Sequence, residues 1–157
     1  MALKSNHGKQ IEQFHAEFLK RLFQITTEAL NRTAMQTVEI AIKKASGMKY
    51  YTDRTTNLRS SIGYVLYHNG VKVSSSFSAH TGTTEGKKEG ESFADEVASK
   101  MTQHGFNIVI VAGMHYAAYV EAKGYDVITG ATMEFEGFLK QNLDVVQEIS
   151  NVDFKSI

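Results

Sequence analysis

GFNIVIVAGMHYAAYVEAKG, residues 105–124, is the stretch that decides the fold of this 157-residue chain. Its first half, residues 106–112, is apolar at nearly every position, which is typical of a β-strand covered on both faces. We therefore predict a central strand here, with a helix on one face and a helix or a second subunit on the other. Its second half places Tyr116, Tyr119 and Glu121 close together. The function depends on whether these three form a binding site or a packing contact.

A long amphipathic helix is predicted earlier in the chain, from about Lys9 to Ala45. At 1.5 Å per residue it would span on the order of 50 Å, more than a domain of this size can cover. We therefore expect part of it to pack on a neighbouring subunit, although a core helix with a solvated end is the alternative. Its apolar residues recur at three- and four-residue steps: Ile11, Phe14, Phe18, Leu22, Ile25, Ala29, Leu30, Ala34, Val38, Ala41 and Ala45.

A β-hairpin is predicted between the long helix and the central strand. The alternating runs 62–68 and 71–77 are joined by Asn69-Gly70, which suits a type I′ turn because both central residues need positive φ. A two-residue loop then sets His68 opposite Val71, Leu66 opposite Val73, Tyr64 opposite Ser75 and Ile62 opposite Phe77. This register puts Ile62, Tyr64, Leu66, Val71, Val73 and Phe77 on the core face, and Val65, Tyr67 and Lys72 on the other. A short helical turn at 57–61 leads into the hairpin.

Two more helices are predicted after the hairpin. Ser92 would cap the first, which ends at Gly105 and buries Phe93, Val97 and Met101. Thr129 or Thr132 would cap the second, after a short strand at 125–128, and Gly137 suggests close backbone packing there. Residues 74–90, rich in serine, threonine, glycine and charge, are expected to form a mobile loop, and 151–157 a loose tail.

These elements predict an α+β fold in a single domain, residues 1–157. A long N-terminal helix packs on a small, mostly antiparallel sheet, which consists of the hairpin and the central strand, and two further helices complete the domain. A chain of this length buries roughly two-thirds of its unfolded surface around one core.

Composition restricts the function. Seventeen basic and seventeen acidic residues give a net charge of zero, and no segment forms a basic stripe, so direct nucleic-acid binding is not expected. No stretch is apolar enough to cross a membrane, and the first residues lack the apolar core of a secretory signal. The absence of cysteine excludes disulfides and thiolate metal sites and fits a reducing compartment. We therefore expect synthesis and assembly in the cytoplasm.

Metal ions, nucleotides and other cofactors are not expected as ligands. The six histidines form no HxH, HxxxH or HExxH pair that would place two imidazoles on one face. The segment Gly86-Lys87-Lys88-Glu89 lacks the hydroxyl of a phosphate-binding loop and carries a carboxylate where phosphate would lie.

The best catalytic candidate is a general base formed by His115 and Glu121, assisted by Tyr116 or Tyr119. No GxSxG turn supplies a nucleophile beside them. Packing explains the same residues more simply, because tyrosines can cover a sheet edge while their hydroxyls stay in water. Glu121 would then need a donor, for which Arg59, Ser61 or a backbone N–H are the candidates. A small cytoplasmic hydrolase is kept as an alternative.

Two short segments resemble the head-tail joining, or tail-completion, proteins of HK97-type long-tailed bacteriophages. One is Thr56-Asn57-Leu58-Arg59-Ser60-Ser61-Ile62, and the other is Val109-Ile110-Val111-Ala112-Gly113 followed by Tyr116-Ala117-Ala118-Tyr119-Val120-Glu121. Those proteins typically carry Thr-Gly-x-Leu-x-x-Ser-Ile, a valine-rich strand ending in glycine, and Tyr-Ala-x-Tyr-Val-Glu before a glycine. Asn57 is taken to stand where the family has glycine, since asparagine also tolerates the left-handed conformation. The family's link between hairpin and strand is shorter than residues 74–104, and its Gly-Thr after the glutamate is replaced by Ala-Lys-Gly-Tyr.

The resemblance implies a structural virion-assembly protein without enzymatic activity, located at the head-tail junction or tail terminus. Implied partners are copies of itself, with a hexameric ring as one candidate, and the portal-connector and tail proteins. The implied location is the host cytoplasm during assembly and then the virion. A non-viral protein-interaction module is a further alternative. The predicted structural-motif and interface residues are Asn57, Leu58, Arg59, Ser61, Tyr116, Tyr119 and Glu121.

Overall fold

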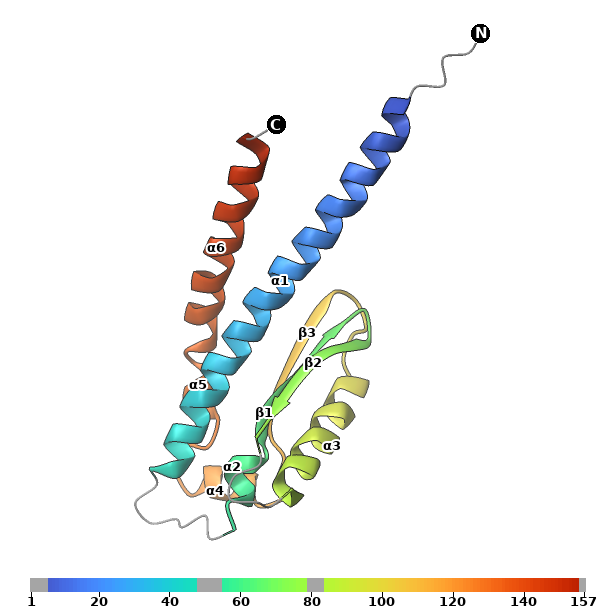
Figure 1. Ribbon diagram of the computed structural model, residues 1–157. Coiled ribbons are helices and arrows are strands. Elements are labelled where there is room, and N and C mark those ends of the chain that lie inside the picture. The colour runs from blue at the N-terminus through green and yellow to red at the C-terminus, as the bar shows by residue number, and fades with distance from the viewer. Residues whose placement is uncertain (1–5, 48–54, 79–83, 156–157) are drawn as a thin grey trace.

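A three-stranded antiparallel sheet lies between the long helix α1 and the shorter helix α3 in the computed structural model (Figure 1). The structure describes residues 6–47, 55–78 and 84–155. The predicted α+β fold, with a long N-terminal helix on a small antiparallel sheet, is confirmed. The elements are α1 (Asn6–Ser46), α2 (Asn57–Ser60), β1 (Ile62–His68), β2 (Val71–Phe77), α3 (Glu85–Ser99), β3 (Phe106–Ala112), α4 (Ala117–Ala122), α5 (Thr129–Thr132) and α6 (Phe135–Lys155).

The strand order is β2-β1-β3, so the central strand is β1 and not residues 106–112 as predicted. All five residues from Ile62 to Leu66 are buried. β3 is an edge strand, but α1 and α3 contact its two faces as they do those of β1. An edge strand covered on both faces has the same apolar pattern as a central one, and the sequence therefore could not distinguish them.

The hairpin register matches the prediction only next to the turn. His68 lies opposite Val71, and Asn69 and Gly70 have φ values of 50° and 77°, as a type I′ turn requires. The register then shifts by one residue between Leu66 and Tyr67. The β-bulge at this shift moves the rest of β2 to the opposite face. Phe77 consequently pairs with Gly63 and lies on the α3 side, while Val71 is exposed, so neither belongs to the predicted core face.

The sheet has a hydrophobic core on each side. The cluster on the α1 side includes Ala34, Val38, Ala41, Leu58, Ile62, Tyr64 and Val120. The cluster on the α3 side includes Val65, Phe77, Ala94, Ala98, Val109 and Val111. The architecture is therefore helix on sheet on helix, which explains why β1 has no polar face.

Helix α3 begins at Glu85, seven residues before the predicted cap Ser92. Its buried positions are Gly86, Gly90, Ala94 and Ala98, whereas the predicted core residues Phe93 and Met101 are exposed. A Cβ on Gly90 would lie 2.6 Å from the backbone oxygen of Ser61, so small residues let α3 approach the sheet closely. The predicted loop 74–90 is thus strand up to Phe77 and helix from Glu85, and residues 79–83 lie outside the described part.

The C-terminal region also differs from the prediction. Residues 125–128 form an irregular link into α5 instead of a strand. Helix α6 continues to Lys155, so most of the predicted loose tail 151–157 is helical. It runs alongside α1, and a Cβ on Gly137 would meet no atom within 4 Å, so the predicted close packing at this glycine is wrong.

Candidate functional site

The segment after β3 is held against the rest of the fold by Ser61. The backbone nitrogen of Gly113 donates to the Ser61 carbonyl at 3.1 Å, and that of Met114 donates to Ser61 Oγ at 3.2 Å. Gly113 is required here because a Cβ would lie 2.5 Å from the Cα of Gly90. Ser61 therefore fixes the start of the segment that follows β3, and it is not the donor for Glu121.

Glu121 is bound by the chain that enters α5. Its carboxylate accepts hydrogen bonds from the backbone amides of Val127 at 2.9 Å, Ile128 at 3.1 Å and Thr129 at 3.1 Å. Of the three proposed donors, the backbone N–H is therefore confirmed. Burial raises the pKa of Glu121, but hydrogen bonds from the Thr129 side chain and from these amides outweigh it, and the pKa is lowered overall. A carboxylate held ionised in this way stabilises a turn.

The two tyrosines lie on a different side of α4 from Glu121. Tyr116 is half-buried beside the α1-side core, and Tyr119 is 65% exposed, with Lys123 Nζ 5.2 Å from the centre of its ring. Together with Val120, Lys123 and Tyr125 they line a shallow apolar hollow of about 260 Å³. Glu121 lines two other hollows. The three side chains therefore do not converge on one cavity.

His115 does not form the predicted pair with Glu121. Among the described residues, its ring contacts that of Tyr116 with a centroid separation of 5.2 Å, and it makes no hydrogen bond to a carboxylate. Because the Glu121 oxygens are occupied by backbone amides, this carboxylate is badly placed to hold a general base.

The predicted motif residues of α2, and Ser61, which follows it, are mostly inside the fold. Asn57, Leu58 and Ser61 are buried, and the Asn57 amide donates to the Glu85 carboxylate of α3. The left-handed residue is Thr56, with φ of 58°, and not Asn57. Counting back from Leu58 in Thr-Gly-x-Leu-x-x-Ser-Ile also places the family's glycine at position 56, so the assignment to position 57 was wrong.

Three sets of polar contacts that the sequence did not predict join distant elements. Lys44 Nζ lies 2.5 Å from Asp126 Oδ2, which connects the end of α1 to the link before α5. A hydrogen bond from Lys44, and a second from the Gly130 amide, lower the pKa of Asp126 despite partial burial. Asn31 on α1 accepts from Tyr64 and Ser74, and Asn142 on α6 donates to Thr33 and Gln36. The available signal was that Asn31 and Thr33 interrupt an apolar helical pattern.

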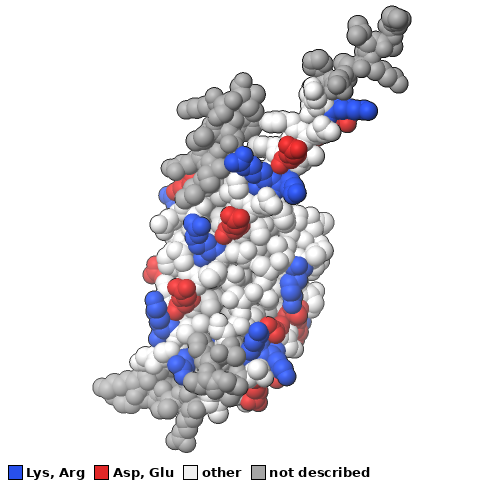
Figure 2. All heavy atoms as spheres, viewed as in Figure 1, with Lys and Arg blue, Asp and Glu red and all other residues white. Residues whose placement is uncertain are grey.

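Charged side chains are dispersed on the face of the molecule that Figure 2 shows. Figure 2 shows acidic and basic side chains interspersed on one face, in keeping with the net charge of zero. Within residues 6–47, 55–78 and 84–155, no three histidine, aspartate or glutamate residues are grouped so that they could hold a metal ion. No helix in these ranges is both long and apolar enough to span a membrane.

Comparison of the chain with protein-family models, with curated proteins and with solved structures gave no match in any of the three.

Proposed function

We propose that this chain is a structural subunit of a long-tailed bacteriophage, placed at the head-tail junction or tail terminus and acting through protein–protein contacts. The observation that carries the proposal is the exposure of large apolar side chains on the amino-terminal half of α1. Ile11 is 67% exposed and Phe14 51% exposed, and both lie on a helix that projects beyond the sheet (Figure 1). Exposed apolar surface of this kind is typical of a surface that binds another protein.

The positions of the predicted motif residues support a structural role. Glu121 fixes the turn into α5, and Ser61 and Leu58 are buried in the subunit. Tyr119 remains exposed beside the apolar hollow and is available for contact with a partner. Tyrosines are enriched in such contacts because they bury a large rigid ring and keep the hydroxyl in water.

The charge distribution also favours protein partners. Nucleic-acid binding requires a concentration of lysine and arginine, whereas acidic and basic residues are interspersed on the face in Figure 2. The resemblance in residues 56–62 and 109–121 supplies the identity of the partners: copies of the chain itself, which a ring would require, and the portal-connector and tail proteins. The location in this proposal is the host cytoplasm during assembly and then the virion.

Assembly in vitro tests the proposal. The full chain is mixed with the connector and tail proteins encoded by the same virus, and complexes are measured by sedimentation. We expect the wild-type chain to bind both proteins and Phe14→Glu to reduce this binding at least tenfold. Met133→Glu is the control and should have little effect, because Met133 is also an exposed apolar side chain, 76% exposed, but does not lie on α1. A wild-type chain that binds neither the connector nor the tail protein overturns the proposal.

A further inference from the structure

The amino-terminal half of α1 carries an apolar face that continues the surface covered by α6. From Ile25 the face runs by steps of four, four and three residues through Ala29 and Thr33 to Gln36. Thr33 and Gln36 receive hydrogen bonds from Asn142 of α6 at 3.0 and 2.8 Å. Residues at these spacings lie on one side of a helix. The side of α1 that contacts α6 is therefore the same side that carries Ile25 and, further toward the amino terminus, Ile11.

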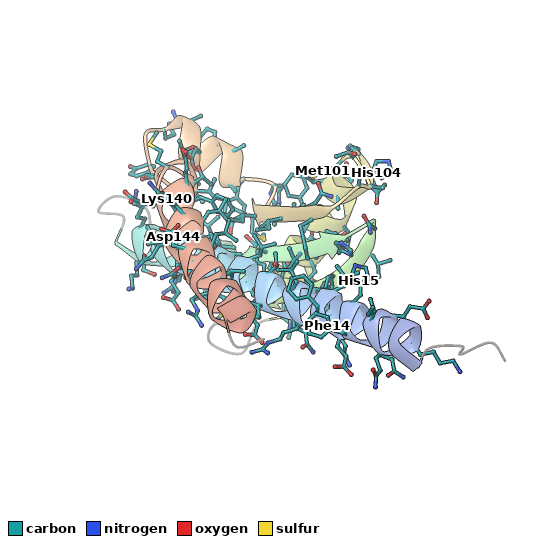
Figure 3. All side chains as sticks on the ribbon, turned by 90° about the horizontal axis from the view of Figure 1, so that it is seen from above. Phe14, His15, Met101, His104, Lys140 and Asp144 are labelled. Atoms are coloured by element: carbon teal, nitrogen blue, oxygen red, sulfur yellow. The ribbon has the colours of Figure 1, made fainter. Side chains whose placement is uncertain are left out.

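Helix α6 does not follow α1 to its amino-terminal end. The two helices are side by side near Asn142 and then diverge, and α1 extends further (Figure 1). Figure 3 shows that Phe14 and His15 on α1 lie well away from Lys140 and Asp144 on α6. Ile11, Phe14 and Leu22 consequently remain exposed, although Phe18 and Ile25 are partly buried and Phe18 has contacts within its own chain.

The apolar face from Ile11 to Ile25 is symmetric along the sequence. Its large side chains are Ile11, Phe14, Phe18, Leu22 and Ile25, at steps of three, four, four and three residues. An identical helix laid antiparallel about Phe18 sets Ile11 opposite Ile25, Phe14 opposite Leu22, and Phe18 opposite its own copy. A two-fold contact requires a surface that matches itself in this way. The face from Ile11 to Ile25 is about 21 Å long at 1.5 Å per residue, sufficient for a helix–helix contact of three turns or more.

Charge favours the antiparallel orientation over the parallel one. Glu12 and Glu17 precede Phe18, and Lys20 and Arg21 follow it. An antiparallel pair places the acidic part of each helix along the basic part of the other, while a parallel pair aligns like charges. Arg21 also has a contact within its own chain.

We propose that two copies of the free chain form a dimer by pairing the amino-terminal halves of α1, antiparallel about a two-fold axis at Phe18. This inference rests on the proposed function, because it names a second copy as the partner of the same apolar surface. The dimer covers Ile11 and Phe14 until the connector and tail proteins compete for them.

The mass of the full chain in solution, measured by light scattering across a concentration series, is the first test. We expect the wild type to form a dimer, Phe14→Glu to shift the dissociation constant upward at least tenfold, and Met133→Glu to leave it unchanged. Circular dichroism of each variant shows whether it folds. A wild type that stays monomeric at the highest concentration, or a folded Phe14→Glu variant with the wild-type dissociation constant, overturns the proposal.

Cross-linking tests whether the two α1 helices are antiparallel. Because the chain has no cysteine, only the introduced cysteines can react. Phe14→Cys and Leu22→Cys are prepared separately and treated with a short bismaleimide, alone and mixed. The antiparallel pair predicts strong cross-linking in the mixture and at least fivefold less in either variant alone, since residue 14 lies opposite residue 22. Equal or stronger cross-linking of Phe14→Cys alone overturns the antiparallel arrangement.

The two proposals can fail separately. A monomeric wild type that still joins the connector and tail proteins contradicts only the dimer. A dimer with the expected cross-links that binds neither protein contradicts only the proposed viral function.

Discussion

Glu121 Oε2 lies 2.9 Å from the backbone nitrogen of Val127, and this hydrogen bond connects α4 to the chain that enters α5. The amides of Ile128 and Thr129 bind the same carboxylate. Val127 and Ile128 precede α5 and Thr129 is its first residue, so the Glu121 carboxylate is the hydrogen-bond partner of three successive backbone amides at the start of this short helix.

Glu121→Gln tests this stabilisation. The substitution keeps the shape of the side chain but removes the charge and replaces one acceptor by an amide nitrogen. We expect the free energy of unfolding at pH 7 to fall by about 1–2 kcal/mol, since hydrogen bonds to charged groups are stronger than neutral ones. Urea unfolding measures the change. The matched control is Glu39→Gln, on an exposed side chain in the interior of α1, and an equal loss in both variants would contradict the stabilising role of Glu121.

Acid should destabilise the protein through the carboxylates that the fold keeps ionised. The pKa of Glu121 is lowered from 4.5, and that of Asp126 from 3.8. A lowered folded-state pKa contributes stability that is fully present above the unfolded-state value and is lost as the pH falls through the folded-state value. We expect little change between pH 7 and 5 and a steep loss below about pH 4. Urea unfolding at several pH values measures this loss. The free energy of unfolding should fall less steeply with acid for Glu121→Gln than for the wild type, and parallel curves would contradict the lowered pKa of Glu121.

Two glycines on helices should respond in opposite directions to alanine. Gly90→Ala places a Cβ 2.6 Å from the Ser61 backbone oxygen, so we expect a loss of about 2–3 kcal/mol as α3 moves away from the sheet. Gly137→Ala meets no atom within 4 Å and should stabilise α6 by about 0.5–1 kcal/mol. Thermal unfolding of both variants provides the measurement. Similar shifts of the same sign would show that α3 does not pack as described.

Thr56→Gly should stabilise the protein. Thr56 has φ of 58°, which is strained for a residue with a branched Cβ. Relief of this strain should raise the free energy of unfolding by about 1 kcal/mol, despite the greater freedom of glycine in the unfolded chain. Thr84→Gly is the control, because its φ of −103° is ordinary and glycine there should only destabilise. Thr56 is buried and its hydroxyl donates to the Thr55 carbonyl, so a loss of stability in both variants would show that these side-chain contacts outweigh the relief of strain.

Local sequence signals were sufficient where neighbouring residues decide the structure. The apolar steps along α1, the Asn69-Gly70 turn and the helical turn before Ile62 were all predicted and are present. The failures came where distant residues meet. The bulge opposite Leu66 moved Phe77 to the other face, and the closeness of Gly90 to Ser61 made α3 pack through its glycines and alanines instead of Phe93.

The candidate site shows the same division. The sequence indicated that Glu121 needs a donor and that Tyr119 could remain in contact with water. It could not indicate that the donors are the amides of Val127, Ile128 and Thr129, because their position depends on how the chain folds back after α4.

The sequence by itself determined the α+β class, the length of α1 and the hairpin turn, because periodicity and turn chemistry are properties of adjacent residues. Only the tertiary structure decided that β1 is central, that Glu121 and the tyrosines lie apart, and that α6 leaves the first turns of α1 exposed. These outcomes depend on which surfaces meet across the fold, and the free energy of such contacts is set by shape and distance that no local pattern contains.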